Sequence, residues 1–185
     1  AGLCVISGLA RGIDSAAHEG ALAAGGRTIA VIGSGLGNLY PRENQSLAEK
    51  ISRNGAVISE FPVDFPPQKR SFPQRNRIVA GWARGTLVIE AGARSGALIT
   101  AGQASDSNRD VYAVPGQIDR PTSQGANRLI QQGAKLVMDA RDVIEEMPNK
   151  FADPGKNPEI CTSRAELLTN SEKIIYAALS GDQAH

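Results

Sequence analysis

The stretch LCVISGLARGID, residues 3–14, decides the fold class: a short apolar run ends at a glycine turn and leads at once into a helix pattern. The same succession recurs along the chain, where β-branched runs end in glycine or serine and helix-length segments separate them. Such repeats are typical of β-α-β units on a parallel sheet. We therefore predict an α/β protein whose mostly parallel sheet carries helices on both faces.

The pattern also predicts where the elements lie. Strands are expected at residues 3–7, 27–32, 56–59, 86–90, 110–113 and 135–138. Helices are expected at about residues 14–24, 42–54, 75–83, 97–108, 126–132 and 140–146. In a fold of this kind ligands gather beyond the carboxyl ends of the strands, so a site is expected in the loops that follow strands.

Composition narrows the class of protein. The chain has 185 residues, 41% of them hydrophobic, which is enough for one domain with a proper core and a small appendage. Its apolar runs are too short to span a bilayer and no basic-then-apolar leader opens it, so we expect a cytoplasmic protein without membrane contact. Two cysteines and two distant histidines predict neither a disulfide framework nor a metal site, and no cofactor is expected.

The ends of the chain suggest a piece of a longer protein. The first residues enter directly on a strand pattern, and residues 148–158 are rich in turn residues and poor in apolar ones. Beyond them, residues 163–180 have the caps and apolar spacing of helices. We predict a main domain at residues 1–147, a linker at 148–162 and the truncated start of a helical module at 163–185.

The segment between Phe65 and Ile89 carries positive charge only. This window contains no Asp or Glu but five basic residues, whereas the whole chain has a net charge of only +1. Within it, Phe72 precedes Arg75 by three residues, which joins a stacking surface to phosphate-directed donors, as single-stranded nucleic acid requires. A solvated basic loop with a buried phenylalanine is the alternative. The basic residues are Lys69, Arg70, Arg75, Arg77 and Arg84.

The loop at residues 7–14 is a candidate phosphate site. It leaves a strand and opens a helix, where backbone N–H groups and one arginine favour negative charge. Its candidate residues are Ser7, Gly8, Arg11 and Gly12. Asp14 could cap the helix and hold Arg11; alternatively, the glycines only turn the chain and Arg11 is a surface charge. His18, one turn later, is interpreted as forming a structural hydrogen bond rather than an acid-base pair.

Three further loops follow strands. Residues 91–101 again place glycine, hydroxyl and arginine at a helix start, and we add Ser95 and Gly96 to the anion site. Residues 33–37 read G-x-G-x-G rather than the dinucleotide fingerprint G-x-G-x-x-G, so we interpret them as a loop shaped by packing or one that adds N–H groups to a shared pocket. Residues 114–119, with 123–127, are interpreted as structural.

Taken in order, these motifs resemble one family. They are SGLARGID at residues 7–14, YPxEN at 40–44, SEFP at 59–62, FPQRNRIVAG at 72–81, VIEA at 88–91, SGALITA at 95–101 and VPG at 114–116. Over about residues 1–147 the chain resembles the DNA-processing protein A family, DprA, also called Smf. The resemblance implies an extended Rossmann-like fold, with the strand that usually precedes the first one missing and a winged-helix-like module beginning at the C-terminal end.

The resemblance also implies a function. Family members bind single-stranded DNA without enzymatic turnover during natural transformation, protect it, load the recombinase RecA and self-associate as homodimers. Carried onto this chain, the DNA pocket would be lined by Arg11, Lys69, Phe72 and Arg75. Asn76 and Arg77 would sit beside it, either as contacts or as braces. Trp82 is expected to pack under the loop.

An enzyme is the main alternative. Similar domains in the lysine-decarboxylase-like phosphoribohydrolases hydrolyse nucleotides with a P-G-G-x-G-T-x-x-E loop. Residues 115–119 of this chain lack its second glycine, its threonine and its glutamate, so hydrolysis is not favoured. A nicotinamide oxidoreductase is less favoured still, and a module that only docks partners is the third possibility.

Overall fold

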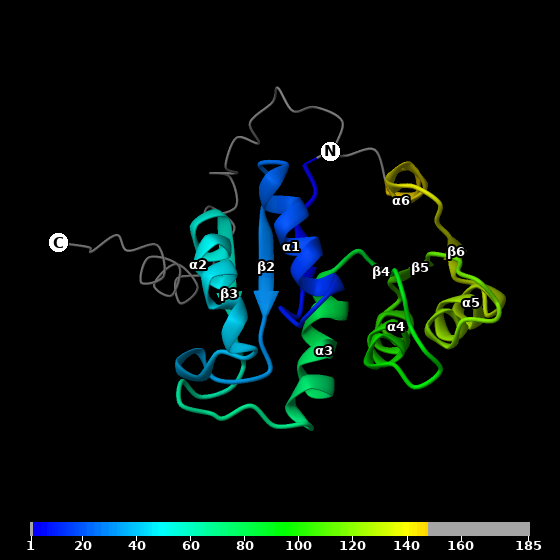
Figure 1. Cartoon of the computed structure of the whole chain (residues 1–185). Helices are drawn as coiled ribbons and strands as arrows, with labels where there is room; N and C mark the ends of the chain where they lie inside the picture. Colours follow the sequence, from blue (N-terminus) through cyan, green and yellow to red (C-terminus); the bar gives the residue numbers. More distant parts are fainter. Residues whose placement is uncertain (1, 148–185) are drawn as a thin grey trace, which may run out of the picture. The chain divides into compact units, whose positions relative to one another are not determined.

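The first part of the chain builds a three-stranded parallel sheet (Figure 1). In the computed structural model, which describes residues 2–147, the strands β1 (Val5–Ser7), β2 (Thr28–Val31) and β3 (Gly55–Ile58) lie in that order. In the register, Ile6 lies beside Ile29, and Ala30 beside Val57. The crossovers are α1 (Ile13–Ala23) and α2 (Gln45–Asn54), and two short 3-10 turns, η1 (Leu36–Asn38) and η2 (Arg42–Asn44), precede α2.

The core of this part forms where α2 covers β2. Leu47 and Ile51 are buried on the inner side of α2, at the i and i+4 spacing that aligns side chains on one helix face. They pack against Ala30 and Ile32 of the central strand, and Leu9 joins the same cluster from the loop after β1. That loop is therefore anchored in the core rather than draped over it.

The second part repeats the arrangement. Strands β4 (Gly85–Val88), β5 (Asp110–Ala113) and β6 (Lys135–Leu136) form another parallel sheet in that order. Its helices are α4 (Gly96–Asp106), α5 (Gln124–Gln131), which follows the 3-10 turn η3 (Pro121–Ser123), and α6 (Ala140–Glu146). Its core is built from small side chains, which let the helices approach the sheet closely: Val88, Ala91, Ala101, Ala113 and Ala126.

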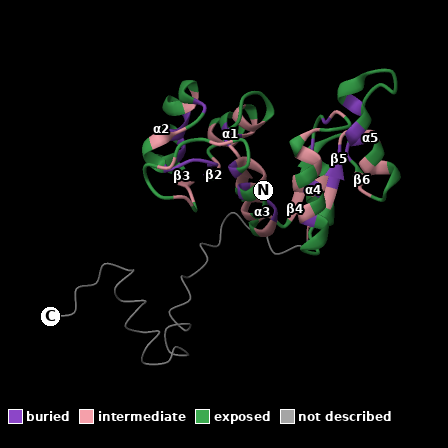
Figure 2. Ribbon diagram, turned by 90° about the horizontal axis from the view of Figure 1, so that it is seen from below, coloured by how far each residue is buried: buried purple, intermediate pink, exposed green. Residues whose placement is uncertain are grey.

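Helix α3 (Ser71–Trp82) carries the chain from the first sheet to the second. It packs against α4 and also contacts β1 and β2, so it touches both parts. Figures 1 and 2 show it between the β1–β3 sheet and the β4–β6 sheet. The first turn of α3 thereby comes to lie over the loops that follow β1 and β2.

The predicted fold class is confirmed, since parallel sheets flanked by helices are present and every strand and helix expected within residues 2–147 has a counterpart. Two details differ. The strands form two sheets of three rather than one, and α3 begins at Ser71, before Pro73, because proline in a first helical turn removes only an N–H that has no partner within the helix.

The predicted linker and C-terminal module lie outside the described residues. Among the helices of residues 2–147, none is both long enough and apolar enough to cross a membrane.

Candidate nucleic-acid interface

The loop after β1 is held in an unusual conformation. Leu9 has a φ of 58°, in the left-handed region that non-glycine residues rarely adopt, and its side chain is fully buried. One carboxylate oxygen of Asp14 accepts hydrogen bonds from the N–H groups of Gly8 and Ala10, both at 3.1 Å. The Asn44 amide donates to the Leu9 carbonyl at 2.9 Å. Contacts on both sides thus stabilise a turn that would otherwise be strained.

Helix α3 lies on this loop and on the loop after β2. The Arg75 guanidinium donates to the Gly8 carbonyl at 2.8 Å and to the Val31 carbonyl. The Ser71 hydroxyl donates to the Gly33 carbonyl. A Cβ at Gly33 would come within 2.7 Å of the Phe72 ring, so this close approach requires glycine.

An arginine and two aromatic rings form a cluster beside α3. The rings of Tyr40 and Phe72 are tilted at 49° with centroids 5.7 Å apart. The Arg11 guanidinium lies 5.6 Å from the Tyr40 ring centroid and donates to the Tyr40 hydroxyl at 3.3 Å. We call Arg11, Tyr40 and Phe72 the aromatic-cation cluster. It combines ring faces with a guanidinium, the two kinds of group that a flexible polyanion with bases can use.

Glu43 forms an ion pair with Arg11 at the edge of the cluster. Its hydrogen bond with Arg11 holds the pKa of the Glu43 carboxyl below its usual value, and the same bond raises the pKa of Arg11. Both side chains are more than half exposed, so water and salt weaken this pair. An incoming phosphate can compete with the Glu43 carboxylate for the guanidinium.

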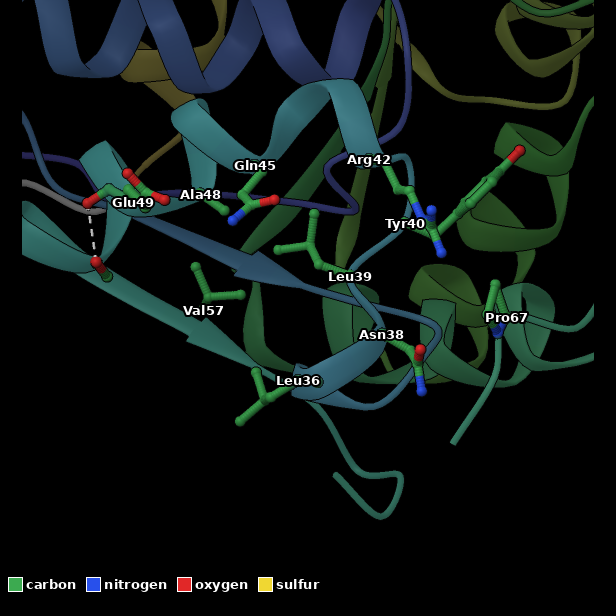
Figure 3. Close-up of a pocket in the computed structure, with 12 residues that line it drawn as sticks. Leu36, Asn38, Leu39, Tyr40, Arg42, Gln45, Ala48, Glu49, Val57 and Pro67 are labelled. Atoms are coloured by element: carbon green, nitrogen blue, oxygen red, sulfur yellow. Dashed lines mark hydrogen bonds between the residues drawn. The ribbon is translucent and has the colours of Figure 1, made fainter. Parts of the chain in front are cut away.

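A hollow of about 580 Å³ lies next to the cluster, and Tyr40 forms part of its wall (Figure 3). Apolar side chains line one part of it, including Leu39 and Val57, while Asn38 and Gln45 supply amide groups. Because Tyr40 also contacts Phe72, the hollow and the aromatic-cation cluster share one wall.

The predicted site residues between Phe65 and Ile89, the window without Asp or Glu, have different environments. Lys69 is exposed just before α3, and Phe72 is half-buried in the cluster. Arg75 is only 5% exposed, and its other hydrogen bond goes to the Asn76 side chain. Arg77 forms an ion pair with Glu60. The structure thus brings Arg11 and Arg75 to the same loop, but it exposes only Arg11.

The remaining predicted residues divide between two loops. Ser7 ends β1, and Gly8 and Gly12 lie with Arg11 in the loop that follows it. Ser95 accepts a hydrogen bond from the Ala97 N–H at 3.3 Å and caps α4, and Gly96 opens that helix. Within residues 2–147, neither Ser95 nor Gly96 forms a hydrogen bond with the aromatic-cation cluster.

Two expectations for single residues are wrong. Asp14 holds the loop amides rather than Arg11, whose carboxylate partner is Glu43. Trp82 is 60% exposed rather than packed under the basic loop. The structural role expected of His18 is confirmed: its Nδ1 lies 2.6 Å from the Thr28 hydroxyl in the core.

The interpretations of the other loops are confirmed. The N–H groups of Gly35 and Gly37 donate to the carbonyls of Phe65 and Val63, so the glycine-rich loop uses them for packing. The Asn127 amide brackets Gly116, accepting from its N–H at 3.0 Å and donating to its carbonyl at 2.9 Å. In the described part of the chain, no three His, Cys, Asp or Glu side chains are grouped to hold a metal ion.

Reasoning from sequence missed Tyr40, Glu43 and Asn44 as parts of the site. Their signal is the YPxEN motif at residues 40–44, which follows the glycine-rich loop. The motif carries a ring, a carboxylate and an amide in five residues, and η2 turns all three toward the loop after β1, where each makes the contacts given above.

The fold and this loop arrangement define a protein of the Rossmann-like α/β class with a cationic and aromatic site at the carboxyl ends of β1 and β2. The family model of DNA recombination-mediator protein A matches residues 1–148, and the chain belongs to this family.

Individual relatives agree with this family assignment. The chain is 47% identical over 181 residues to Protein Smf of Escherichia coli, covering 91% of this chain and 48% of that protein. It is 51% identical over 144 residues to the DNA processing protein DprA of Streptococcus pneumoniae, covering 78% and 51%. The chain therefore spans about half the length of the curated relatives it matches.

Solved structures agree with the fold. The X-ray structure of DprA from Streptococcus pneumoniae matches with a TM-score of 0.74 at 49% identity, covering 79% of this chain and 52% of that one. DprA from Helicobacter pylori, described for its unique single-stranded DNA binding mode, matches with a TM-score of 0.70 at 30% identity, covering 77% and 64%.

Proposed function

We propose that this chain binds single-stranded DNA without catalysing a reaction, as a member of its family. In this proposal it protects incoming DNA, loads RecA in natural transformation and recombination, and acts as a cytoplasmic homodimer. Binding to DNA is supported by the single-stranded DNA binding mode described for Helicobacter pylori DprA and by the relatives that are named as DNA processing proteins. The contacts of the aromatic-cation cluster support the proposed location of the DNA site.

The single observation that carries the proposal is the placement of Arg11 against the Tyr40 ring, which in turn contacts the Phe72 ring. A base can stack on an exposed ring face while a guanidinium binds the adjoining phosphate. Lys69, three residues before Phe72, adds a second exposed cation just before α3. Duplex DNA hides its base faces, so this combination favours a single strand.

The loop that could suggest hydrolysis has a structural use instead. In the phosphoribohydrolases a P-G-G-x-G-T-x-x-E loop carries the catalytic carboxylate, whereas here Gly116 is bracketed by the Asn127 amide. The absence of that carboxylate from residues 115–119 supports a binding protein rather than an enzyme.

Fluorescence anisotropy tests the binding proposal. We expect the 185-residue chain to bind a labelled oligothymidylate more tightly than a duplex of equal length. Each phosphate neutralised on a single strand contributes about 0.7 to the logarithmic salt slope, so Arg11 and Lys69 together predict a slope of about −1.4 or steeper. Equal affinity for the two forms of DNA would contradict the proposal.

Phe72→Leu sharpens the test, because leucine keeps an apolar side chain over Gly33 but removes the ring. Loss of stacking on one base corresponds to about 1–3 kcal/mol. Trp82→Leu is the matched control, since it removes an exposed aromatic ring from the other end of the same helix. Equal losses in the two variants would show that Phe72 does not stack on a base.

The partner proposals have separate tests. Light scattering should give twice the chain mass of 19.4 kDa for a homodimer. RecA filament formation on single-stranded DNA, followed with and without the chain, tests loading, and an unchanged rate would contradict it.

A further inference from the structure

The buried guanidinium of Arg75 is the feature that single-strand binding does not itself explain. Arg75 lies in the window without acidic residues, and the sequence analysis predicts that it contacts DNA. In the fold its side chain is 5% exposed and donates to two backbone carbonyls, those of Gly8 and Val31, and to Asn76. A side chain so enclosed and so engaged has little surface left for a phosphate.

We propose that Arg75 is a positioning residue, which fixes the turn at residues 8–10 and so places Arg11 for DNA, without touching DNA itself. This inference rests on the proposed function. Arg75 reaches across from α3 to the turn, while Asp14 holds the Gly8 and Ala10 N–H groups from α1. Arg11 follows that turn directly in the chain.

The fit around Gly8 supports this role. A Cβ at Gly8 would lie 2.5 Å from the Arg75 guanidinium and 2.8 Å from the Asp14 carboxylate, so the two charged groups close on the turn from both sides. Burial lowers the pKa of Arg75, and the nearby charge of Asp14 opposes that change. The positive charge of Arg75 is therefore held inside the protein, where the negative charge of Asp14 partly compensates it.

The salt dependence of binding separates a positioning residue from a ligand. Removing a residue that binds a phosphate flattens the salt slope by about 0.7 whether or not Arg11 is present. A residue that acts only by placing Arg11 changes the slope by no more than Arg11 itself does, and in the Arg11→Gln background its removal changes neither affinity nor slope. The experiment measures the anisotropy of labelled oligothymidylate with the full chain over a salt series for Arg75→Gln, Arg11→Gln, the double variant and the exposed control Arg53→Gln.

We expect Arg11→Gln to lower affinity about tenfold and to flatten the slope by about 0.7. Arg75→Gln should lower affinity about fivefold or more with less change in slope than Arg11→Gln, and the double variant should bind no more weakly than Arg11→Gln alone within a factor of two. Arg53→Gln should match the wild type. A slope change of 0.7 for Arg75→Gln, with losses that multiply in the double variant, would show a direct phosphate ligand and overturn the inference.

A second variant keeps the inference testable if Arg75→Gln does not fold. Asn44→Ala removes the amide that holds the Leu9 carbonyl, and it leaves the buried charges in place. The same signature is expected, a lower affinity with no more change in slope than Arg11→Gln, and wild-type affinity in Asn44→Ala would count against a positioned turn. If the wild-type chain binds no DNA, the proposed function fails, and the inference with it. If it binds and only the Arg75 and Asn44 signatures are missing, the inference alone fails.

Discussion

The loop after β1 and the loop after β4 contain the same kinds of residue, but only the first belongs to a cluster. Each has glycine, a hydroxyl side chain and an arginine at a helix start. In the first, Asp14, Asn44 and Arg75 hold the turn and Arg11 reaches Tyr40. In the second, Ser95 caps its own helix.

The comparison shows that a glycine-rich loop at a helix start is not in itself an anion site. What distinguishes the first loop is the helix that follows two strands later, because α3 brings Arg75 onto it from 67 residues along the chain. Four predictions test this difference between the two loops.

The largest expected effect comes from adding one methyl group to each loop. Gly8→Ala forces a Cβ against Arg75 and Asp14, and such overpacking costs about 1–3 kcal/mol. Gly96→Ala meets nothing within 4 Å at the start of α4, so it should be neutral or stabilising by about 0.5 kcal/mol. Urea unfolding followed by circular dichroism measures both. Similar midpoints for the two variants would show that the first loop is not clamped.

The two arginines provide the next comparison. Arg11→Gln should weaken binding to labelled oligothymidylate about tenfold, because Arg11 is the cation that lies against an aromatic ring. Arg94→Gln, which removes the corresponding exposed arginine of the second loop, should change affinity less than twofold. Anisotropy at low salt measures both values. A larger loss for Arg94→Gln would move the site to the start of α4.

Between pH 7 and 5.5, a pH effect on stability is expected from His18 in the first part of the molecule. The Thr28 hydroxyl donates to the Val5 carbonyl, so it accepts from Nδ1 of His18, and the buried Nε2 then has no partner within the described residues. Burial lowers the pKa of His18 below 6.5, with Arg75 adding to the effect and Asp14 opposing it. The folded state therefore binds fewer protons than the unfolded one.

The stability contributed by neutral His18 is complete above pH 6.5, the pKa of an unfolded histidine, and declines as the pH falls below it. Between pH 7 and 5.5 the free energy of unfolding should therefore fall, by at most about 1 kcal/mol, which is the limit set by the pKa of an unfolded histidine. Urea titrations at several pH values measure it. In His18→Gln the dependence in this range should largely disappear, and an unchanged dependence would assign it to other groups.

Sequence periodicity was sufficient for the fold class and the order of the elements, because each element carries its own local signal, but it did not show that the strands divide into two sheets. Helix α6 matches its predicted bounds, since Asp139 and Asp142 form a capping box at its start. The first loop could also be singled out as a candidate site, because its glycines and Arg11 follow a strand directly. These features depend on neighbours in the chain.

The burial of Arg75 could not be predicted in the same way. Its partners are carbonyls of Gly8 and Val31, 67 and 44 residues away, and no sequence pattern marks a carbonyl as available. Nor does an acid-free window leave its arginines unpaired, since Glu60 reaches Arg77 from just outside it. Charge sorted along the sequence was therefore a poor guide to which cations face solvent.

The smallest expected effect concerns the carboxylate that holds Arg11. Glu43→Gln removes a competitor of the DNA phosphate, so affinity for oligothymidylate should rise about two- to fivefold at low salt and much less at high salt, where the exposed pair is screened. Glu60→Gln is the matched control, because it frees Arg77 instead. An equal gain in both variants would indicate a general effect of net charge, whereas a gain in Glu43→Gln alone would place the phosphate at Arg11. The ion pair that lowers the pKa of Glu43 in the free protein would then be what DNA must displace in order to bind.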